Sequence, residues 1–324
     1  MNRRNFTLAA ATFAAAWQPM LARAQAWPDK PIKLVLSQPA GSGPDAMARM
    51  IGDALGKKWN QPVVVENKPG GQNAIGAQAA AKSPADGYNF YFATAAALVT
   101  NPYLFKSLPY DPKRDFVPVG MVGKVPFVLS VNPTSGVKTL AEFIAYAKAN
   151  PGKVNVANEG PKTFGGMMTR LIGAQLGLQL NAVPYVSVGA AATDVVGGQV
   201  EMLVSDLPSV AQQFKAGKLR PIAVTTAKKV AGMENVATFS EAIPGFDYAG
   251  WLAIVAPTGT PAAAIQRFNR DLDAALADKD LAAKILAIGP ISEGAGTPEQ
   301  MAAFLAAEHE RWSQVTKVVG ILPE

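Results

Sequence analysis

Short runs rich in β-branched and aromatic residues alternate with helical patterns along almost the whole chain. This alternation is the strongest constraint on the fold, because it favours α/β architecture with mostly parallel sheets. The expected strands are residues 32–37, 63–67, 89–94, 126–132, 153–157, 182–186, 202–205, 219–226 and 249–256. The expected helices are residues 44–58, 73–82, 139–149, 164–177, 189–197 and 208–216, followed by C-terminal helices within 261–287 and 298–319.

Two long extended stretches are candidate segments in which the chain crosses from one domain to the other. Residues 116–132 read FVPVGMVGKVPFVLSVN, and residues 246–257 read FDYAGWLAIVAP. If the chain leaves one domain at the first stretch and returns at the second, residues 27–123 plus 250–324 form domain 1 and residues 124–249 form domain 2. Two neighbouring crossings make a hinge, so we expect a ligand cleft between the domains. The alternative is one continuous large sheet.

The N-terminus has the layout of an export signal. Residues 1–26 combine a basic start, an Ala/Phe-rich stretch and a final A-x-A cleavage pattern. The pair Arg3 and Arg4 also fits the twin-arginine route, and the general and twin-arginine routes both stay open. The apolar stretch is too short for a membrane anchor. We expect cleavage after Ala24 or Ala26 and a protein in the periplasm.

Charge and composition exclude several classes of function. Removing residues 1–24 takes away three arginines and no acid, so 27 basic residues face 24 acids and the net charge falls from +6 to +3. That balance is too mild to favour nucleic acid. The chain has no cysteine, which excludes disulfides, thiolate chemistry and cysteine metal sites.

Searches for catalytic motifs find little. There is no G-x-S-x-G elbow and no H-E-x-x-H, and Ser135 to Lys138 matches S-x-x-K without its companion motifs. The single histidine, His309, lies in AAEHERW and is expected to be a solvated helix residue. No acids cluster with metal-ligand spacing. We therefore expect no catalytic residue, no metal and no cofactor.

Small-residue loops follow several of the expected strands. They are PAGSGPD (39–45), TAAA (94–97), NEGPKTFGG (158–166), PYVSVGAA (184–191) and SDLPS (205–209). In an open α/β sheet, ligands bind at the carboxyl edge, where the next helices present unpaired N–H groups to an anion. We expect Thr94, Ala95, Thr163 and Asp206 in these loops to contact the ligand.

The first loop also matches a dinucleotide fingerprint. Residues 41–46, GSGPDA, fit G-x-G-x-x-G/A after a strand and before a helix. However, Asp45 falls in the first helical turn, where its carboxylate would repel a pyrophosphate. It could instead accept a bond from a ligand, or serve only as a helix cap. We therefore expect this loop to hold a smaller anion.

Taken together, the motifs resemble a known family. The chain is similar to the Bug (TctC-type) periplasmic solute-binding proteins of tripartite tricarboxylate transporters. The resemblance is carried by WPDKPIKLVLSQPAGSGPDAMAR, VVVENKPGGQNAIGAQAAAKSPADGY, NPYLFKSLPYDPKRDFVPV, VPYVSVGAAATDVVGGQV and GWLAIVAPTGTP. It implies a two-domain Venus flytrap of type II-like topology, each domain a mostly parallel sheet flanked by helices. It also implies a small carboxylate ligand held between the domains.

The resemblance further implies which residues hold the carboxylate. By position these are the first loop (Gly41, Ser42, Gly43 and Asp45) and a second loop (Tyr185, Ser187, Val188, Gly189 and Ala190). The second loop departs from the family's P-Y-K-G-G-G, since valine replaces the lysine.

The loop at 158–166 also carries larger side chains than the family's loop usually does. It carries Lys162, a candidate partner for a second carboxylate, and Phe164, a candidate surface for an aromatic ring. A solvated lysine and a core phenylalanine are the alternatives. We expect an aromatic or other dicarboxylate such as terephthalate, rather than an aliphatic acid.

The resulting hypothesis is a monomeric binding protein, not an enzyme, that delivers its ligand to membrane permease subunits. An exported α/β enzyme acting on a small carboxylate and a ligand-sensing partner of a signalling receptor are the alternatives.

Overall fold

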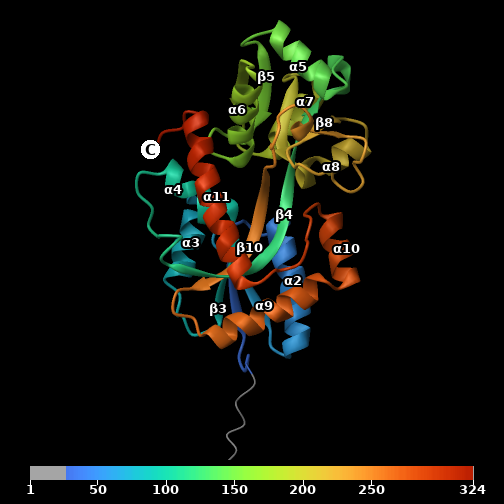
Figure 1. Ribbon diagram of the computed structural model, residues 1–324. Helices are drawn as coiled ribbons and strands as arrows, with labels where there is room; N and C mark the ends of the chain where they lie inside the picture. The colour runs from blue at the N-terminus through green and yellow to red at the C-terminus, as the bar shows by residue number, and fades with distance from the viewer. Residues whose placement is uncertain (1–26, 324) are drawn as a thin grey trace, which may run out of the picture.

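The computed structural model describes residues 27–323 and contains the expected alternation of strands and helices (Figure 1). The strands are β1 (Ile32–Leu36), β2 (Val63–Asn67), β3 (Asn89–Thr94), β4 (Phe116–Val131), β5 (Val154–Asn158), β6 (Leu180–Pro184), β7 (Met202–Asp206), β8 (Arg220–Val224), β9 (Ala237–Thr238) and β10 (Ala249–Pro257). The α-helices are α2 (Gly43–Trp59), α3 (Ala74–Ala81), α4 (Asn101–Leu104), α5 (Leu140–Ala149), α6 (Phe164–Leu176), α7 (Val188–Val196), α8 (Leu207–Lys215), α9 (Ala262–Leu276), α10 (Lys279–Ala287) and α11 (Pro298–Val318). Short helical turns cover Gly71–Asn73, Ala96–Thr100, Pro133–Ser135 and Phe239–Glu241.

The strands form a curved sheet with the order β2-β1-β3-β10-β4-β7-β5-β6, and β8 and β9 branch from β4. The pairs β1–β2, β1–β3, β5–β6, β5–β7 and β8–β9 are parallel. The strands that cross the middle are antiparallel to their neighbours. Two mostly parallel regions are therefore joined by antiparallel crossing strands, β4 and β10 (Figure 1).

Strand β4 changes partners along its length. From Phe116 to Pro126 it pairs with β10, and from Phe127 to Val131 it pairs with β7 and β8. The hydrogen-bonded order is continuous through β4, so this strand belongs to both regions. The change of partner supports our proposal that residues 27–123 plus 250–324 and residues 124–249 are the two domains.

Helices cover both faces of the sheet. In the first region, Ile32, Leu34 and Leu36 pack with Met47 and Ile51 of α2 on one face. On the opposite face, the intervening Val35 packs in a separate core with residues of α3. Burial on both faces explains the apolar run of β1, as expected for a strand in a parallel sheet.

Helix α11 connects the two regions. It comes from the end of the chain, yet it lies against both α4 and α6 (Figure 1). Trp312 stacks edge-on with Phe164 of α6 at 5.5 Å. Trp251 of β10 donates a hydrogen bond to the buried Glu308 carboxylate at 2.9 Å. Met301, Trp312 and Val315 of the C-terminal helix belong to the same core as Val35, which is separate from the core that contains the α2 and α9 residues.

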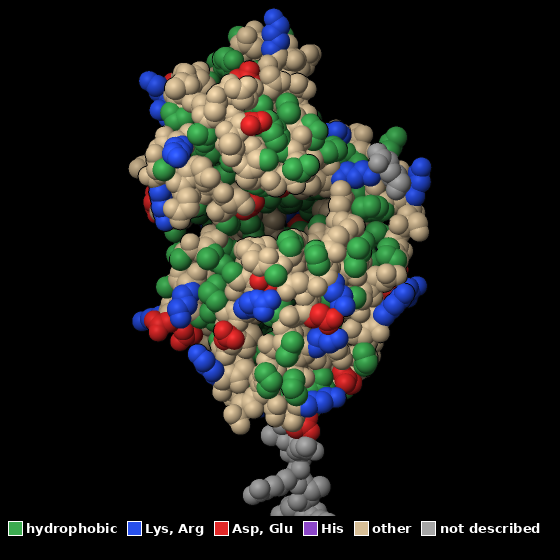
Figure 2. Space-filling model, turned by 180° about the vertical axis from the view of Figure 1, so that it is seen from behind, with side chains coloured by type: hydrophobic (Ala, Val, Ile, Leu, Met, Phe, Trp, Pro, Cys, Tyr) green, Lys and Arg blue, Asp and Glu red, His purple; other side chains and the backbone are tan. Residues whose placement is uncertain are grey.

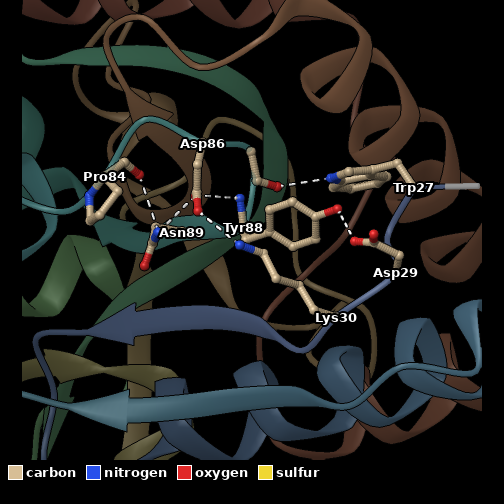
Figure 3. Close-up of polar contacts among 8 residues, drawn as sticks. Trp27, Asp29, Lys30, Pro84, Asp86, Tyr88 and Asn89 are labelled. Atoms are coloured by element: carbon tan, nitrogen blue, oxygen red, sulfur yellow. Dashed lines mark hydrogen bonds and ion pairs between the residues drawn. The ribbon is translucent and has the colours of Figure 1, made fainter. Parts of the chain in front are cut away.

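The first described residues are fixed to the body of the protein. Trp27 donates from Nε1 to the carbonyl of Gly87 at 3.0 Å, and Lys30 forms an ion pair with Asp86 at 3.2 Å (Figure 3). Tyr88 donates from its hydroxyl to Asp29 (Figure 3). The expected export signal, residues 1–26, lies outside the described residues. None of the helices between residues 27 and 323 combines the length and the apolarity that crossing a bilayer requires.

Candidate functional site

A cavity of ≈ 1300 Å³ lies between the two regions of the sheet. The space-filling view shows the surface hollowed between the upper and lower parts of the molecule (Figure 2). Eight of the residues expected to bind the ligand line this cavity: Ser42, Gly43, Thr94, Ala95, Lys162, Thr163, Phe164 and Asp206. Segments far apart in the sequence therefore meet at one site.

The lower wall is built at the carboxyl ends of β1 and β3. The Ser42 side chain caps α2 by accepting from the amide of Asp45 at 3.4 Å, and Gly43 opens that helix. Thr94 accepts from the amide of Ala97 at 3.3 Å. A helix N-terminus carries unpaired amides and the positive end of the helix dipole, so this wall favours an anion.

Asp45 stabilises the first loop and does not line the cavity. Its carboxylate accepts from the Gly41 amide at 2.9 Å and from Asn67 Nδ2 at 2.8 Å. It also binds both Nε and Nη2 of Arg49, at 3.1 and 3.0 Å. Burial alone would raise the pKa of Asp45, but the bonds from Arg49, Asn67 and Gly41 outweigh it and hold the pKa below its usual value. Gly41 has φ +81° and likewise lies outside the lining.

The upper wall is built at the carboxyl ends of β5 and β7. Thr163 caps α6, accepting from the amide of Gly166 at 3.2 Å, and its hydroxyl donates to the carbonyl of Gly160 at 2.7 Å. Asp206 caps α8, accepting from the Ser209 amide at 2.9 Å. Two further helix N-termini therefore face the same cavity as the start of α2.

Lys162 and Phe164 both contact elements of the other region, Lys162 at α4 and Phe164 at Trp312 of α11. The Lys162 ammonium donates to the carbonyl of Leu104 at 3.2 Å and lies 5.3 Å from the ring centre of Phe105. Phe164 packs against Phe127 at 4.5 Å and also lines the cavity. Phe164 is thus a core residue and a cavity-lining residue at once, so the two alternatives weighed for it are not exclusive.

The second loop lies on the same sheet edge but outside the cavity lining. The Tyr185 amide donates to the carbonyl of Asn158 at 2.8 Å, and its hydroxyl donates to Asp194 at 2.8 Å. Ser187 caps α7 by accepting from Ala190 at 3.2 Å. The loop residues Tyr185, Ser187, Val188, Gly189 and Ala190 are all absent from the lining. Their role in binding stays a prediction.

Glu159, the first residue after β5, also lines the cavity, although it is not among the residues expected from the sequence. Burial raises the pKa of Glu159 to about 7, and the nearby Asp206 carboxyl adds to that rise. The amides of Glu159 and Gly165 act in the opposite direction but are weaker. The only signal in the sequence was an acid directly after an expected strand, inside one of the candidate ligand-binding loops.

His309 corrects one expectation. It is 7% exposed rather than solvated, and its ring lies 6.3 Å from that of Tyr103. Burial lowers its pKa to about 4, and the charge of Lys113 acts in the same direction. It lies outside the main cavity. Among residues 27–323, no three His, Cys, Asp or Glu side chains are grouped so that they could hold a metal ion.

A two-domain α/β fold with helix N-termini around a central cavity defines the class of periplasmic binding proteins. The sequence model described as "Tripartite tricarboxylate transporter family receptor" matches residues 47–321. Protein BugT of Bordetella pertussis is 35% identical over 92% of this chain and 91% of its own. The chain therefore belongs to the tripartite tricarboxylate transporter receptor family.

Solved structures agree with this assignment. R. palustris Rpa4515 with adipate is 33% identical, with a TM-score of 0.83 over 92% of this chain and 100% of that chain. MatC from Rhodopseudomonas palustris with bound malate is 25% identical, with a TM-score of 0.75 over 89% and 99% of the two chains. The fold class expected from the sequence is confirmed, and so is the resemblance to the Bug (TctC-type) family.

Proposed function

We propose that this protein captures a small carboxylate in the periplasm and delivers it to the membrane permease of a tripartite tricarboxylate transporter. The observation that carries the proposal is the cavity between the two regions, lined by the N-termini of α2, α6 and α8. Amides and helix dipoles of this kind bind anions without any catalytic residue. The adipate and malate bound to two structural relatives support the same ligand class.

The crossing strands provide the mechanism of capture. Strands β4 and β10 run side by side between the regions, and β4 changes partners at Pro126. A bend there would move the upper wall against the lower wall. A carboxylate that contacts both walls binds the closed form more tightly, so ligand shifts the population toward closure.

The lining favours a dicarboxylate with an apolar body. Phe127, Phe164 and Trp251 supply aromatic surface, and Lys162 supplies a positive charge at the edge of the upper wall. An aromatic dicarboxylate such as terephthalate would use both features, with one carboxylate near the start of α2 and the other near Lys162.

Location and partners follow from the export signal and the family. We propose that the chain is cleaved near Ala24 or Ala26 and acts as a monomer in the periplasm. If the protein is instead a ligand-sensing partner of a signalling receptor, its ligand would occupy the same cleft. If it is an exported enzyme acting on a small carboxylate, that carboxylate would be its substrate. Turnover of the ligand on incubation would favour the enzyme.

Thermal unfolding of the chain from residue 27, with a panel of carboxylates, tests the proposal. The panel pairs terephthalate with benzoate and adipate with hexanoate, and includes malate. Ligand at 100 times its Kd stabilises the folded state by about 2.7 kcal/mol, which raises Tm by about 5–10 °C. A panel that leaves Tm unchanged at millimolar concentration, or a ligand that is consumed, would contradict the proposal.

A further inference from the structure

Glu159 is a mostly buried acid in a cavity proposed to hold an anion. It follows β5 directly and lines the upper wall. Its Oε2 atom is buried and has no hydrogen-bond partner within the described chain. A carboxylate with one buried, unpartnered oxygen is costly when charged, and a second negative charge from a bound ligand would raise that cost.

The packing around Glu159 explains its position. A Cβ atom at Gly165 of α6 would overlap Oε2 and would lie 2.9 Å from the carbonyl oxygen of Val204. The carboxyl therefore occupies the space that the missing side chain of Gly165 leaves, between the start of α6 and the end of β7. A group enclosed by backbone on this side has little room to turn toward water.

The charged groups around the cavity do not neutralise Glu159. Besides Glu159, the charged residues in the lining are Lys162, Asp206, Lys215 and Glu234. Asp206 is the one whose charge acts on the Glu159 carboxyl, and its effect is unfavourable to ionisation. The Asp206 carboxyl is itself bonded to Ser209, through both amide and hydroxyl. Two acids on one wall disfavour simultaneous ionisation, so one of them holds a proton more readily.

We propose that Glu159 is the group of the cleft that holds a proton, and that a carboxylate ligand binds beside Glu159 when the Glu159 carboxyl is protonated. When Glu159 is ionised, capture takes up one proton from solvent, which adds to its carboxylate, and no other bond forms or breaks; when Glu159 is already protonated, capture takes up none. This inference rests on the proposed function and adds a requirement: the ligand brings a negative charge, not an ammonium group, to the upper wall.

The sign of the pH dependence follows from linkage. Only the protonated form binds, so affinity is full below the pKa of about 7 and falls as pH rises through it. The apparent Kd of adipate should increase about 25-fold between pH 6.5 and pH 8.5, a range in which both adipate carboxyls are already ionised. An ammonium-bearing ligand would show the opposite trend, because its charge favours ionised Glu159.

Calorimetric titration of adipate into the chain from residue 27 tests the inference. Titrations at pH 7 in two buffers of different ionisation enthalpy should give an uptake of about half a proton, rising toward one at pH 8.5. Glu159→Gln keeps the size of the side chain and stays neutral, so it should bind adipate with an affinity independent of pH. Glu310→Gln, at an exposed carboxylate of α11 that accepts from Gln314, should behave as the unmodified protein does.

The outcomes separate the two proposals. Adipate or malate binding with no pH dependence and no proton uptake overturns the role of Glu159 and leaves the proposed function standing. An affinity that rises with pH would likewise overturn the role of Glu159 and leave the proposed function standing. So would a pH dependence of the affinity that persists in Glu159→Gln and disappears in Asp206→Asn. Failure of every carboxylate in the panel at every pH overturns the proposed function, and this inference with it.

Discussion

The start of α6 packs so closely on the preceding loop that one methyl group should disturb it. A Cβ atom at Gly166 would overlap the carbonyl oxygen of Gly160 and would lie 2.8 Å from its carbonyl carbon. That carbonyl is fixed by two bonds from Thr163, one from the amide at 3.2 Å and one from the hydroxyl at 2.7 Å. We therefore expect Gly166→Ala to destabilise the protein.

The magnitude follows from three contributions. Moving the Gly160 carbonyl breaks two hydrogen bonds at about 1 kcal/mol each, and the remaining overlap costs about 1–3 kcal/mol. Alanine offsets about 1 kcal/mol of this, because it loses less backbone entropy than glycine in a helix. The net loss is about 2–4 kcal/mol, or about 5–15 °C in Tm.

Thermal unfolding of the two alanine variants provides a matched comparison. Gly189 of α7 is also helical, but a Cβ atom there meets only Ser187 Oγ at 4.0 Å. Gly189→Ala should therefore leave Tm unchanged or raise it by about 1–3 °C. If Gly166→Ala is as stable as the unmodified protein, or if both variants change Tm equally, the close packing of the loop on α6 is refuted.

Two further substitutions test the lower wall and the edge of the upper wall. Asp45→Asn keeps the shape of the side chain but removes the charge that binds Arg49. Tm should therefore fall by about 2–8 °C in a melting experiment. An unchanged Tm would contradict the bonding seen around this carboxylate. Lys162→Met should weaken the binding of adipate more than that of hexanoate in calorimetric titrations, because only the dicarboxylate has a second charge for the ammonium to bind. Equal losses of affinity for both ligands would remove that role of Lys162.

The sequence predicted the outer strands well because their signal is local. Each apolar run of four to eight residues is bounded by turn residues, and the fold keeps these boundaries within a few positions. Strand β4 was harder to predict, because Pro118, Gly120, Gly123 and Pro126 suggest breaks. It continues through them since β10 pairs alongside it with shifts in register at Leu252/Ala253 and Ile254/Val255.

The parts of the site that the sequence did not predict depend on tertiary packing. Glu159 becomes unusual only because α6 and β7 enclose it, and no local pattern records that burial. His309 has charged neighbours in sequence, yet the helix turns it toward Tyr103. The position of the Tyr185 loop relative to the cavity depends on how the two regions are oriented around β4 and β10. Short sequence motifs do not encode that orientation.

The most direct test of the central claim is a crystal structure of the chain from residue 27 grown with the carboxylate that stabilises it most. We predict one ligand in the cavity, with contacts to the start of α2 on the lower wall and to the loop of residues 158–164 on the upper wall. A ligand bound outside the cavity, or one that contacts a single wall with the other left open, would contradict the account.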